Sequence, residues 1–444
     1  MLFHILDRVF EVNPQADVAV VIGHKGAMVE EKVRAEYPKK NVSFVVQEDP
    51  QGTGHAVKCA MHSEWGKRVI HDKRAVLILP GDLPMISTAL VQEMSEVLPR
   101  ATAIRMLTAN LQNAEGYGRV VRKGKRGPII RVVEDRDANA REKLLNEVAL
   151  SIYTVQAPFL EAGVSDLKNN NAQNEYYLPD LIHWASRKKR TIDALDWQNV
   201  EDVRGVNNPW ELAQATQILN HRVVKQHAMN GVKIIDVCGT YIQPTVTIAA
   251  DVTIYPGAIL EGRTEIASGA VIGPAVFLKN VIVGSNAEIK AGTVAEDSIV
   301  ESNAKVGPYA HLRPESHVGS NSKIGNFVEL KKTRIGKDTS VAHLSYLGDA
   351  EVGDRVNIGC GFITCNFDGR VIDGQRKHRT VIEDDVFVGS DCQFVAPIQV
   401  RKGSYVASGS TITENVESDA LAIARSRQVN KPGYAKKLRG NSGS

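Results

Sequence analysis

The chain has 444 residues, more than one hydrophobic core usually serves, so at least two domains are expected. Lysine and arginine exceed aspartate and glutamate by 54 − 51 = 3, which gives no reason to expect nucleic acid or an anionic membrane surface as the main partner. The five cysteines contain no C-x-x-C pair, and no apolar run approaches the ~20 residues that span a bilayer. The N-terminal run MLFHILDRVFEVN has no basic region typical of a signal peptide. We therefore expect a cytoplasmic protein without disulfides, structural zinc or membrane insertion.

Up to about Leu219, short apolar runs alternate with helical patterns. The apolar runs predict buried strands over 18–23, 42–47 and 75–79. The helical patterns lie at 28–37 and 56–65, and a further helix is expected over 209–229, where this half joins the next. Strands separated by helices are typical of a parallel sheet with helices on both faces.

Two loops follow predicted strands in this half. They are QEDPQGTGH, over 47–55, and PGDLP, over 80–84. In a parallel α/β sheet, ligands bind beyond the carboxyl ends of the strands. These two loops are therefore candidate ligand-binding segments.

From Ile248 onward, the apolar residues recur with a period of six. The regular positions are Ile248, Ile254, Leu260, Ile266, Ile272 and Leu278, and, after a break, Val300, Val306, Leu312, Val318, Ile324 and Leu330. A fixed period of six predicts a parallel β-helix, in which each hexad forms one side of a triangular coil and points its aliphatic residue inward. Three sides give a coil of eighteen residues, so about nine coils are expected up to Ile412. A β-sandwich would need a period of two, which the sequence does not show.

Several motifs, in order along the chain, carry a resemblance to one enzyme family. They are QGTGHA (51–56), GYGR (116–119), NNNAQ-x-EYY (169–177), GVNN (205–208) and the long run from HLRPESH to CNFDG (311–369). Together they resemble the bifunctional bacterial enzymes that make UDP-N-acetylglucosamine. In these enzymes, glucosamine-1-phosphate acetyltransferase is joined to N-acetylglucosamine-1-phosphate uridylyltransferase. The resemblance covers nearly the whole chain.

This resemblance implies the fold of each part. It implies a Rossmann-like α/β nucleotidyltransferase domain over 1–208, a helical linker over 209–235, a left-handed parallel β-helix of hexapeptide repeats over 236–424 and a tail over 425–444. It also implies a homotrimer with acetyltransferase sites between subunits. The substrates would be small molecules, and the product would be a precursor of peptidoglycan and lipopolysaccharide.

His343, in the run VAHLSYLGDA, is the candidate base of the acetyltransferase. Acetyl transfer needs a neutral amine to attack a thioester, and histidine suits proton abstraction near neutral pH. A lone histidine is by default a solvated turn residue, but the resemblance of the surrounding run implies the catalytic role.

A pair of cations is expected to bind the sugar phosphate. Arg313 and Lys331 are eighteen residues apart, which equals one predicted coil, so they should stack on one face. The resemblance implies that both bind the phosphate. It implies further sugar-phosphate contacts from Tyr346, Asn357 and Lys377.

For acetyl-CoA, the resemblance implies contacts from Cys360, Asn366, Phe367, Ser390, Ser408 and Arg425. Cys360 and Ser408 stand where the family usually has alanine, and Phe367 stands for a tyrosine. The loop 369–377 is longer than usual. These differences bear on the affinity for CoA and leave the base and the cation pair unchanged.

Uridylyl transfer uses Mg²⁺, which typically takes one or two carboxylates together with substrate phosphates. The resemblance implies that Asp82 and Asn207 bind the metal. It implies further contacts to the UDP-sugar from Gln47, Gly52, Thr53, Pro80, Gly81, Gly118 and Glu134.

Two features depart from the family in the N-terminal half. The family opens with a strand and a loop, L-x-x-G-x-G-T-R-M, that cradles the triphosphate, and nothing like it precedes Val18. Ala149 stands where an asparagine binds the sugar, and Pro179 replaces a threonine. From the sequence as written, we therefore expect a first strand to be missing, with acetylation of glucosamine-1-phosphate and little uridylyl transfer from UTP to N-acetylglucosamine-1-phosphate.

Three interpretations remain open. The first is the bifunctional family enzyme, whose uridylyl transfer depends on a start upstream of Met1. The second is a monofunctional acetyltransferase with a vestigial N-terminal domain. The third is a non-catalytic trimer that binds sugar nucleotides, although His343 together with Arg313 and Lys331 argues against it.

Overall fold

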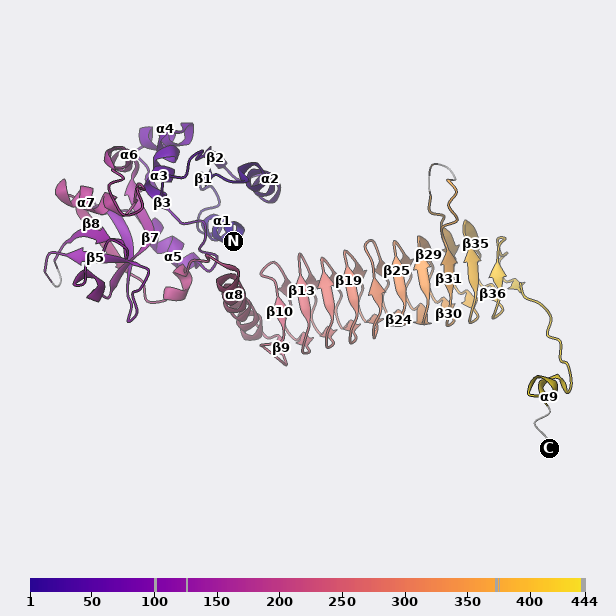
Figure 1. Ribbon diagram of the computed structural model, residues 1–444. Coiled ribbons are helices and arrows are strands. Elements are labelled where there is room, and N and C mark those ends of the chain that lie inside the picture. Colours follow the sequence, from indigo (N-terminus) through magenta and orange to yellow (C-terminus); the bar gives the residue numbers. More distant parts are fainter. Residues whose placement is uncertain (100–101, 125–126, 372–373, 375, 441–444) are drawn as a thin grey trace. The chain divides into compact units, whose positions relative to one another are not determined.

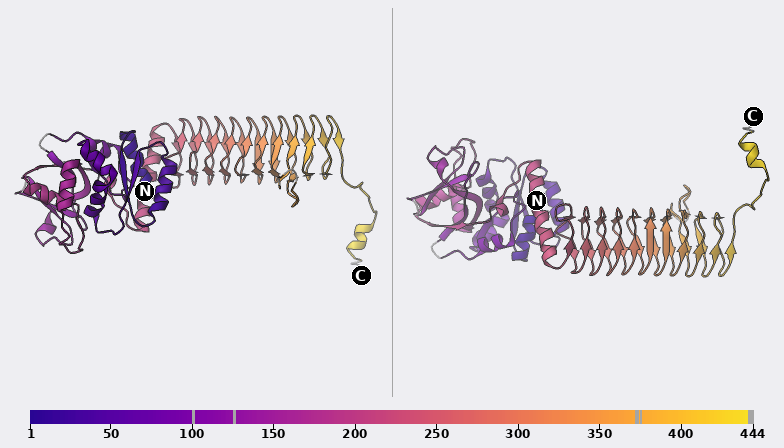
Figure 2. Two further views of the ribbon diagram at one scale, coloured as in Figure 1. Left: turned by 90° about the horizontal axis from the view of Figure 1, so that it is seen from above. Right: turned by 90° about the horizontal axis from the view of Figure 1, so that it is seen from below.

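The computed structural model describes residues 1–99, 102–124, 127–371, 374 and 376–440. They form two compact units, Met1–Thr216 and Gln217–Ser444. The division falls within helix α8 (Pro209–Met229), the helix expected over 209–229. Figures 1 and 2 show that the first unit combines helices with sheets and that the second is a stack of coils. No helix in the described ranges is both long and apolar enough to cross a membrane.

Serine side chains cap two helices of the first unit. The pattern expected as one helix over 56–65 is two, because Ser63 ends α3 and its hydroxyl caps α4 by accepting the N–H of Gly66. Ser87 caps α5 in the same way through the N–H of Leu90. The helices are α1 (Leu2–Val12), α2 (Gly26–Glu36), α3 (Thr53–His62), α4 (Glu64–His71), α5 (Thr88–Ser95), α6 (Ala157–Asp166) and α7 (Asp180–Arg187).

The strands of the first unit form two separate sheets. A small sheet pairs β1 (Val18–Ile22) in parallel with β2 (Val42–Val46). The larger sheet has the order β6-β5-β7-β4-β8, with β3 also paired to β7. Its strands are β3 (Ala75–Ile78), β4 (Thr102–Asn110), β5 (Gly118–Arg122), β6 (Ile129–Val133), β7 (Glu147–Gln156) and β8 (Thr191–Asp196).

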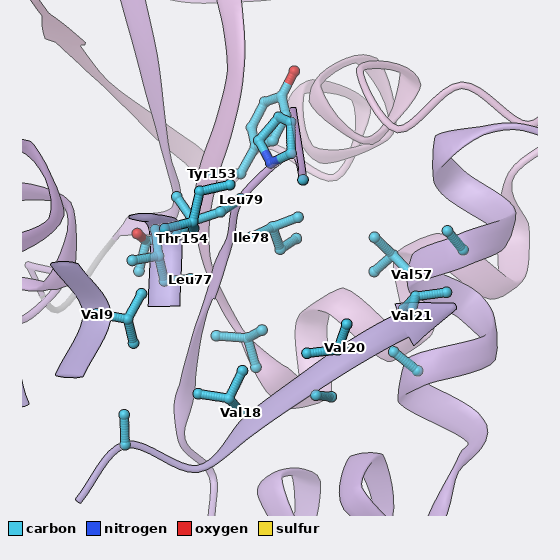
Figure 3. A pocket seen from close by; sticks show the side chains of 18 of the residues that line it. Val9, Val18, Val20, Val21, Val57, Leu77, Ile78, Leu79, Tyr153 and Thr154 are labelled. Carbon is cyan, nitrogen blue, oxygen red and sulfur yellow. The ribbon is translucent and has the colours of Figure 1, made fainter. Parts of the chain in front are cut away.

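The prediction of a wholly parallel sheet is wrong for the larger sheet, because β7 runs antiparallel to β3, β4 and β5. Antiparallel neighbours need no crossover helix. Between β4 and β7 the described chain accordingly contains only the short 3-10 helix η1 (Glu142–Leu144) besides strands. The prediction of fully buried strands over 18–23, 42–47 and 75–79 is also wrong, because Ile22 and Val76 are the only fully buried residues in these ranges. Ile22 is the one fully buried residue of β1, because the second edge of β1 faces a cavity instead of another strand (Figure 3).

The second unit is the predicted parallel β-helix. Its short strands run from β9 (Lys233–Ile234) to β38 (Leu421–Ala422), and α9 (Tyr434–Leu438) follows. They form three parallel sheets, in each of which neighbouring strands come from consecutive coils. Apart from Ile248, which is half-buried in the first coil, every hexad residue named above is at most 5 % exposed. A coil can bury its aliphatic residues only against its neighbours, so the whole stack shares one core.

The coils are less uniform than the expected eighteen residues. The register gives 271 − 253 = 18 residues between Thr253 and Val271, but 340 − 323 = 17 between Lys323 and Ser340. One later coil is longer, with 387 − 357 = 30 residues between Asn357 and Phe387. This coil contains the segment between β31 (Ile363–Cys365) and β32 (Thr380–Ile382), whose described residues on either side, 366–371 and 376–379, project from the stack in Figure 1. Inserted residues leave the coil at a corner, so the strands on either side still stack.

Candidate functional sites

One corner of the β-helix aligns residues from consecutive coils in a column. The strands that lead to this corner stack in register, and they are β24 (Lys323–Asn326), β27 (Ser340–His343), β30 (Asn357–Ile358), β33 (Phe387–Val388) and β36 (Tyr405–Val406). Asn326 pairs directly with His343. The same registers place Cys360, Ser390 and Ser408 at the corresponding positions of the next coils. The candidate base and three candidate acetyl-CoA residues thus share one column, which we call the corner column.

Within the corner column, His343 is exposed and makes one side-chain hydrogen bond. Its Nδ1 lies 2.6 Å from Oδ1 of Asn326 in the preceding coil. Its backbone carbonyl accepts the hydroxyl of Ser345 at 2.8 Å, which fixes the corner that carries the ring. Nε2 has no hydrogen-bond partner among the residues that the structure describes.

Arg313 and Lys331 occupy equivalent positions on neighbouring coils, as their spacing predicted. They lie at the ends of β22 (His311–Leu312) and β25 (Glu329–Lys331), whose register aligns Leu312 with Leu330. Arg313 is held by Glu329, with Nη1 2.9 Å from Oε1. Lys331 has no acidic partner within the described ranges. The face therefore carries one paired and one unpaired cation.

Tyr346 and Asn366 converge over Gly348, the last residue of β28 (Tyr346–Gly348). A Cβ at Gly348 would clash with both the Tyr346 hydroxyl and Nδ2 of Asn366, so only glycine leaves room for the two groups. Asn366 is 5 % exposed, and its Nδ2 donates to Oδ2 of Asp349 at 2.5 Å. Asp349 thereby fixes which way the amide points.

Other candidate residues lie farther out. Lys377 places its Nζ 4.1 Å from the ring centroid of Phe367, which is exposed. Asn357 begins β30, one coil beyond His343 on the same sheet. Arg425 is exposed near the end of the stack, where its Cδ lies 3.7 Å from the position of a Cβ on Gly409. No contact joins Asn357 or Arg425 to His343 in the described structure.

In the first unit, the loop after β2 is joined to the segment before α7. The N–H of Tyr176 donates to the carbonyl of Gln51 at 2.8 Å, and the N–H of Gly54 donates to the carbonyl of Tyr176 at 2.7 Å. Gly52 has φ +100°, and a Cβ there would lie 2.7 Å from the Tyr176 carbonyl oxygen, so this close approach requires glycine. Nε2 of Gln47 lies 3.4 Å from the Gly52 carbonyl oxygen. The Thr53 hydroxyl accepts the N–H of Leu178 at 3.1 Å, so Gln47, Gly52 and Thr53 form one ordered loop.

Asp82 and Asn207 meet around Gly205. A Cβ on Gly205 would lie 3.3 Å from Oδ2 of Asp82 and 3.9 Å from Nδ2 of Asn207. The loop that begins Pro80-Gly81-Asp82 is fixed to this segment by the N–H of Val206, which donates to the Asp82 carbonyl at 3.1 Å. Asn207 donates to Glu211 through both its backbone N–H, at 2.7 Å, and its Nδ2, at 3.2 Å.

The contact with Glu211 decides whether Asn207 suits a metal. Because Nδ2 donates to Glu211, Oδ1 of Asn207 is left as a free oxygen ligand. No cluster of three or more His, Cys, Asp or Glu side chains suited to a metal occurs in the described ranges. One carboxylate and one amide oxygen fit Mg²⁺, which fills its other positions with water and substrate phosphates. These two side chains are too few for a metal that takes all its ligands from the protein.

Gly118, Glu134 and Ala149 lie together at the start of β5. Gly118 pairs with Ala149, and a Cβ on Gly118 would lie 3.6 Å from both carboxylate oxygens of Glu134. Burial, followed by the nearby carboxylates of Asp180, Asp137 and Asp135, raises the pKa of Glu134. Burial likewise raises the pKa of Asp180. Ala149 is buried and lies beside this cluster of carboxylates.

The sequence analysis missed several residues that hold the candidate side chains in place. Asn326 and Glu329 lie one coil before His343 and Tyr346, so comparing residues seventeen apart would have found them. Glu211 lies four residues after Asn207, at the start of a predicted helix. No pattern in the sequence pointed to Asp349 or Asp180.

Comparisons with known proteins agree with this architecture. The family model for the MobA-like NTP transferase domain matches residues 1–143, and the model for the bacterial transferase hexapeptide (six repeats) matches residues 297–332. The chain is 43% identical to the bifunctional protein GlmU of Geotalea uraniireducens over 420 residues, which cover 94% of this chain and 89% of that protein. It is 41% identical to the protein of the same name from Trichlorobacter lovleyi over 96% of this chain and 89% of that protein. The Clostridioides difficile protein of this name is 40% identical over 98% of this chain and 91% of that protein.

Proposed function

Because the chain belongs to the family of bifunctional GlmU proteins, we propose that it makes UDP-N-acetylglucosamine through acetyl transfer in the β-helix and uridylyl transfer in the first unit. The acceptor of the first reaction is glucosamine-1-phosphate, and its acyl donor is acetyl-CoA. The second reaction joins UTP to N-acetylglucosamine-1-phosphate. The corner column is the single observation that carries the acetyltransferase assignment, since it aligns a free histidine nitrogen with the candidate acyl-donor residues.

We propose that His343 is the general base of acetyl transfer. The amino group of glucosamine-1-phosphate attacks the carbonyl carbon of the thioester, forming the C–N bond while the C–S bond breaks. The proton lost by the nitrogen moves to Nε2 of His343, which can return it to the departing sulfur of CoA. Oδ1 of Asn326 accepts a hydrogen bond from the Nδ1–H of His343. This hydrogen bond favours the tautomer whose lone pair is on Nε2, the atom that takes the proton from the amine.

The cation pair binds the phosphate of the acceptor. Lys331 has no acidic partner within the described ranges, so its ammonium can form an ion pair with the phosphate. Glu329 holds the planar guanidinium of Arg313 beside Lys331. Tyr346, Asn357 and Lys377 bind the remainder of the sugar phosphate. Acetyl-CoA lies along the corner column against Cys360, Ser390 and Ser408, with contacts from Asn366, Phe367 and Arg425.

The sequence led us to expect little uridylyl transfer, but membership of the bifunctional family and the NTP transferase domain over 1–143 support this second reaction. For it, we propose that Asp82 and Asn207 hold Mg²⁺. Bound there, the ion would neutralise the charge that develops on the triphosphate oxygens. The ordered loop of Gln47, Gly52 and Thr53, together with Pro80 and Gly81, would bind the nucleotide. Gly118 and Glu134 would bind the acceptor sugar.

The active form is proposed to be a cytoplasmic homotrimer. Beside the corner column, Tyr309, Phe327 and Leu344 occupy equivalent corners of three consecutive coils and are 58%, 56% and 58% exposed. The rings of Tyr309 and Phe327 stack with centroids 5.7 Å apart. A continuous stripe of large apolar side chains is the kind of surface that a subunit contact covers. Because Leu344 follows His343, such a contact would enclose the base.

A CoA-release assay tests the acetyltransferase assignment. With acetyl-CoA in excess, glucosamine-1-phosphate should release free thiol, whereas glucosamine without the phosphate should react far more slowly. Equal rates with the two acceptors would show that the cations do not bind the phosphate.

A further inference from the structure

The longest coil of the β-helix has a neck, where the chain leaves the stack after β31 and returns to it before β32 (Figure 1). We define the neck as residues 366–368 together with 377–379. Three of the proposed substrate contacts lie on it. Asn366 and Phe367 are assigned to acetyl-CoA, and Lys377 is assigned to the sugar phosphate. The positions of all three therefore depend on what holds the two sides of the neck together.

Two hydrogen bonds join the two sides of the neck, and both come from His378. The backbone N–H of His378 donates to the carbonyl of Asn366 at 2.9 Å. The ring of His378 makes the second contact, with Nε2 3.2 Å from Oδ1 of Asp368. Only 5 % of His378 is exposed, so its ring is largely shielded from water. We call the contact between the His378 ring and the Asp368 carboxylate the neck clamp.

Arg370 fixes the carboxylate of Asp368 on its side of the neck clamp. The Nε of Arg370 donates to Oδ2 at 2.7 Å, and its backbone N–H donates to Oδ1 at 2.9 Å. The side-chain hydrogen bond, followed by that of the backbone, lowers the pKa of Asp368, so the carboxylate is ionised at neutral pH. An ionised carboxylate only accepts hydrogen bonds, so Nε2 of His378 carries the proton that it donates to Asp368.

Lys377 directly precedes His378 and depends on the neck for its position. Its Nζ lies 4.1 Å from the centroid of the Phe367 ring, and Phe367 directly precedes Asp368. Because Phe367 is 56 % exposed, this cation–π contact is weak by itself. A lysine has a long, flexible stem, so its ammonium can be directed at a phosphate only from a fixed backbone. The neck clamp supplies that fixed backbone one residue away from Lys377.

We propose that Asp368 and His378 are positioning residues for acetyl transfer, because the neck clamp places Lys377 where its ammonium meets the phosphate of the acceptor. This inference rests on the proposed function, which assigns Lys377 to that phosphate. Both residues act through Lys377 and not on the reacting atoms. The acetyl-CoA site depends less on the clamp, because Asp349 holds Asn366 independently, with Oδ2 2.5 Å from Nδ2.

The test combines steady-state CoA release with a double-mutant cycle on Asp368 and Lys377. Asp368→Ala removes the acceptor but leaves the buried ring of His378 in place, so the chain should fold. It should raise KM for glucosamine-1-phosphate roughly tenfold, about the effect of one hydrogen bond to a charged group, with little change in kcat or in KM for acetyl-CoA. Asp368→Asn keeps an acceptor at Oδ1 and should restore most of the parental KM. In the Lys377→Ala chain, adding Asp368→Ala should raise KM no further.

The matched control is Glu301→Ala. The carboxylate of Glu301 also accepts from a histidine, with Oε1 2.6 Å from Nε2 of His317, but neither residue lies on the neck. This variant should keep the parental KM for both substrates. Hydrogen exchange at the backbone amide of His378 gives a second readout that needs no activity. It should be faster in Asp368→Ala than in the parent, because the neck opens more often without the clamp.

Four results would overturn the inference in an active chain. They are an unchanged KM in Asp368→Ala, an equal shift in Glu301→Ala, KM factors that multiply in the double variant, and unchanged exchange at His378 in Asp368→Ala. Multiplying factors would mean that Asp368 acts independently of Lys377. A parent chain that releases no CoA would instead contradict the proposed function, and the inference with it, whatever the exchange at His378 shows.

Discussion

Asn326 and His343 occupy equivalent positions in neighbouring coils, and Oδ1 of Asn326 lies 2.6 Å from Nδ1 of His343. A histidine on an exposed corner would otherwise sample several ring orientations and both tautomers. The hydrogen bond selects the tautomer with the proton on Nδ1 and leaves Nε2 free to take a proton. Asn326 is thus a positioning residue for the proposed base.

Replacing Asn326 should weaken acetyl transfer without weakening substrate binding. Asn326→Ala is expected to lower kcat by roughly 10–100-fold, the usual cost of losing a partner that orients a functional histidine, with little change in KM. In Asn326→Asp, the carboxylate can still accept a hydrogen bond from the Nδ1–H of His343, so this variant should keep most of the activity. Its negative charge stabilises imidazolium and should move the acidic limb of the pH–rate profile to higher pH.

The matched control for this prediction is Asn321→Ala. Asn321 makes the same kind of contact between coils, donating to Oδ1 of Asp338 at 3.0 Å, but at a different position. Its replacement should leave kcat and the pH profile unchanged. If Asn326→Asp were as inactive as Asn326→Ala, orientation through Nδ1 would not be the role of this residue.

Removing the unpaired cation should act on the acceptor. Lys331→Ala is expected to raise KM for glucosamine-1-phosphate, because the phosphate is bound but takes no part in the bonds that form and break, while kcat changes less. Lys332→Ala is the control, since its ammonium already pairs with Glu315 at 3.2 Å. Steady-state kinetics would contradict the assignment if both variants shifted KM equally.

The cluster of carboxylates around Glu134 should make the first unit less stable as the pH rises. The pKa of Glu134 is higher in the folded chain than in the unfolded chain, so the folded state binds more protons between those two values. Stability therefore falls as the pH rises from the ordinary glutamate range through the raised pKa. Glu134→Gln removes the cost of burying a charged carboxylate. It should therefore raise the melting temperature at pH 7.5, but much less at pH 4.

The size of that effect can be measured by calorimetry. Each unit of pKa difference is worth ~1.4 kcal/mol, and 1 kcal/mol moves the melting temperature of a unit of this size by roughly 2–4 °C. Glu115→Gln, on an exposed carboxylate, should change the melting temperature equally little at both pH values. A Glu134→Gln chain that is less stable than the parent at pH 7.5 would show that the charged carboxylate is favourable there.

The apolar stripe beside the corner column should control assembly. Leu344→Glu is expected to convert the proposed trimer to monomers and to abolish most acetyl transfer, while the single chain stays folded because the side chain is exposed. Leu144→Glu changes an exposed leucine in the first unit and should leave the trimer intact. Analytical ultracentrifugation separates these outcomes, and an intact trimer in Leu344→Glu would place the contact elsewhere.

The sequence predicted the β-helix better than the first unit. The period of six determines the position of each residue within its coil. It therefore suffices to place Leu312 and Leu330 in one core and Arg313 beside Lys331. The order of the larger sheet depends on pairings between distant strands, such as β3 with β7, which no local period encodes. For the same reason, the sequence did not point to Asp180 or Asp349. Asp180 matters because folding brings it near the carboxyl of Glu134, and Asp349 because folding brings it to the amide of Asn366.

The most direct test of the account is CoA release by the His343→Ala chain, with trimer content measured on the same sample. As the proposed base, His343 should contribute ~10²–10⁴-fold to kcat, so the variant should lose that factor while its assembly and its KM for acetyl-CoA stay close to those of the parent. A trimeric His343→Ala chain that turns over at nearly the parental rate would contradict the assignment of His343 as the base.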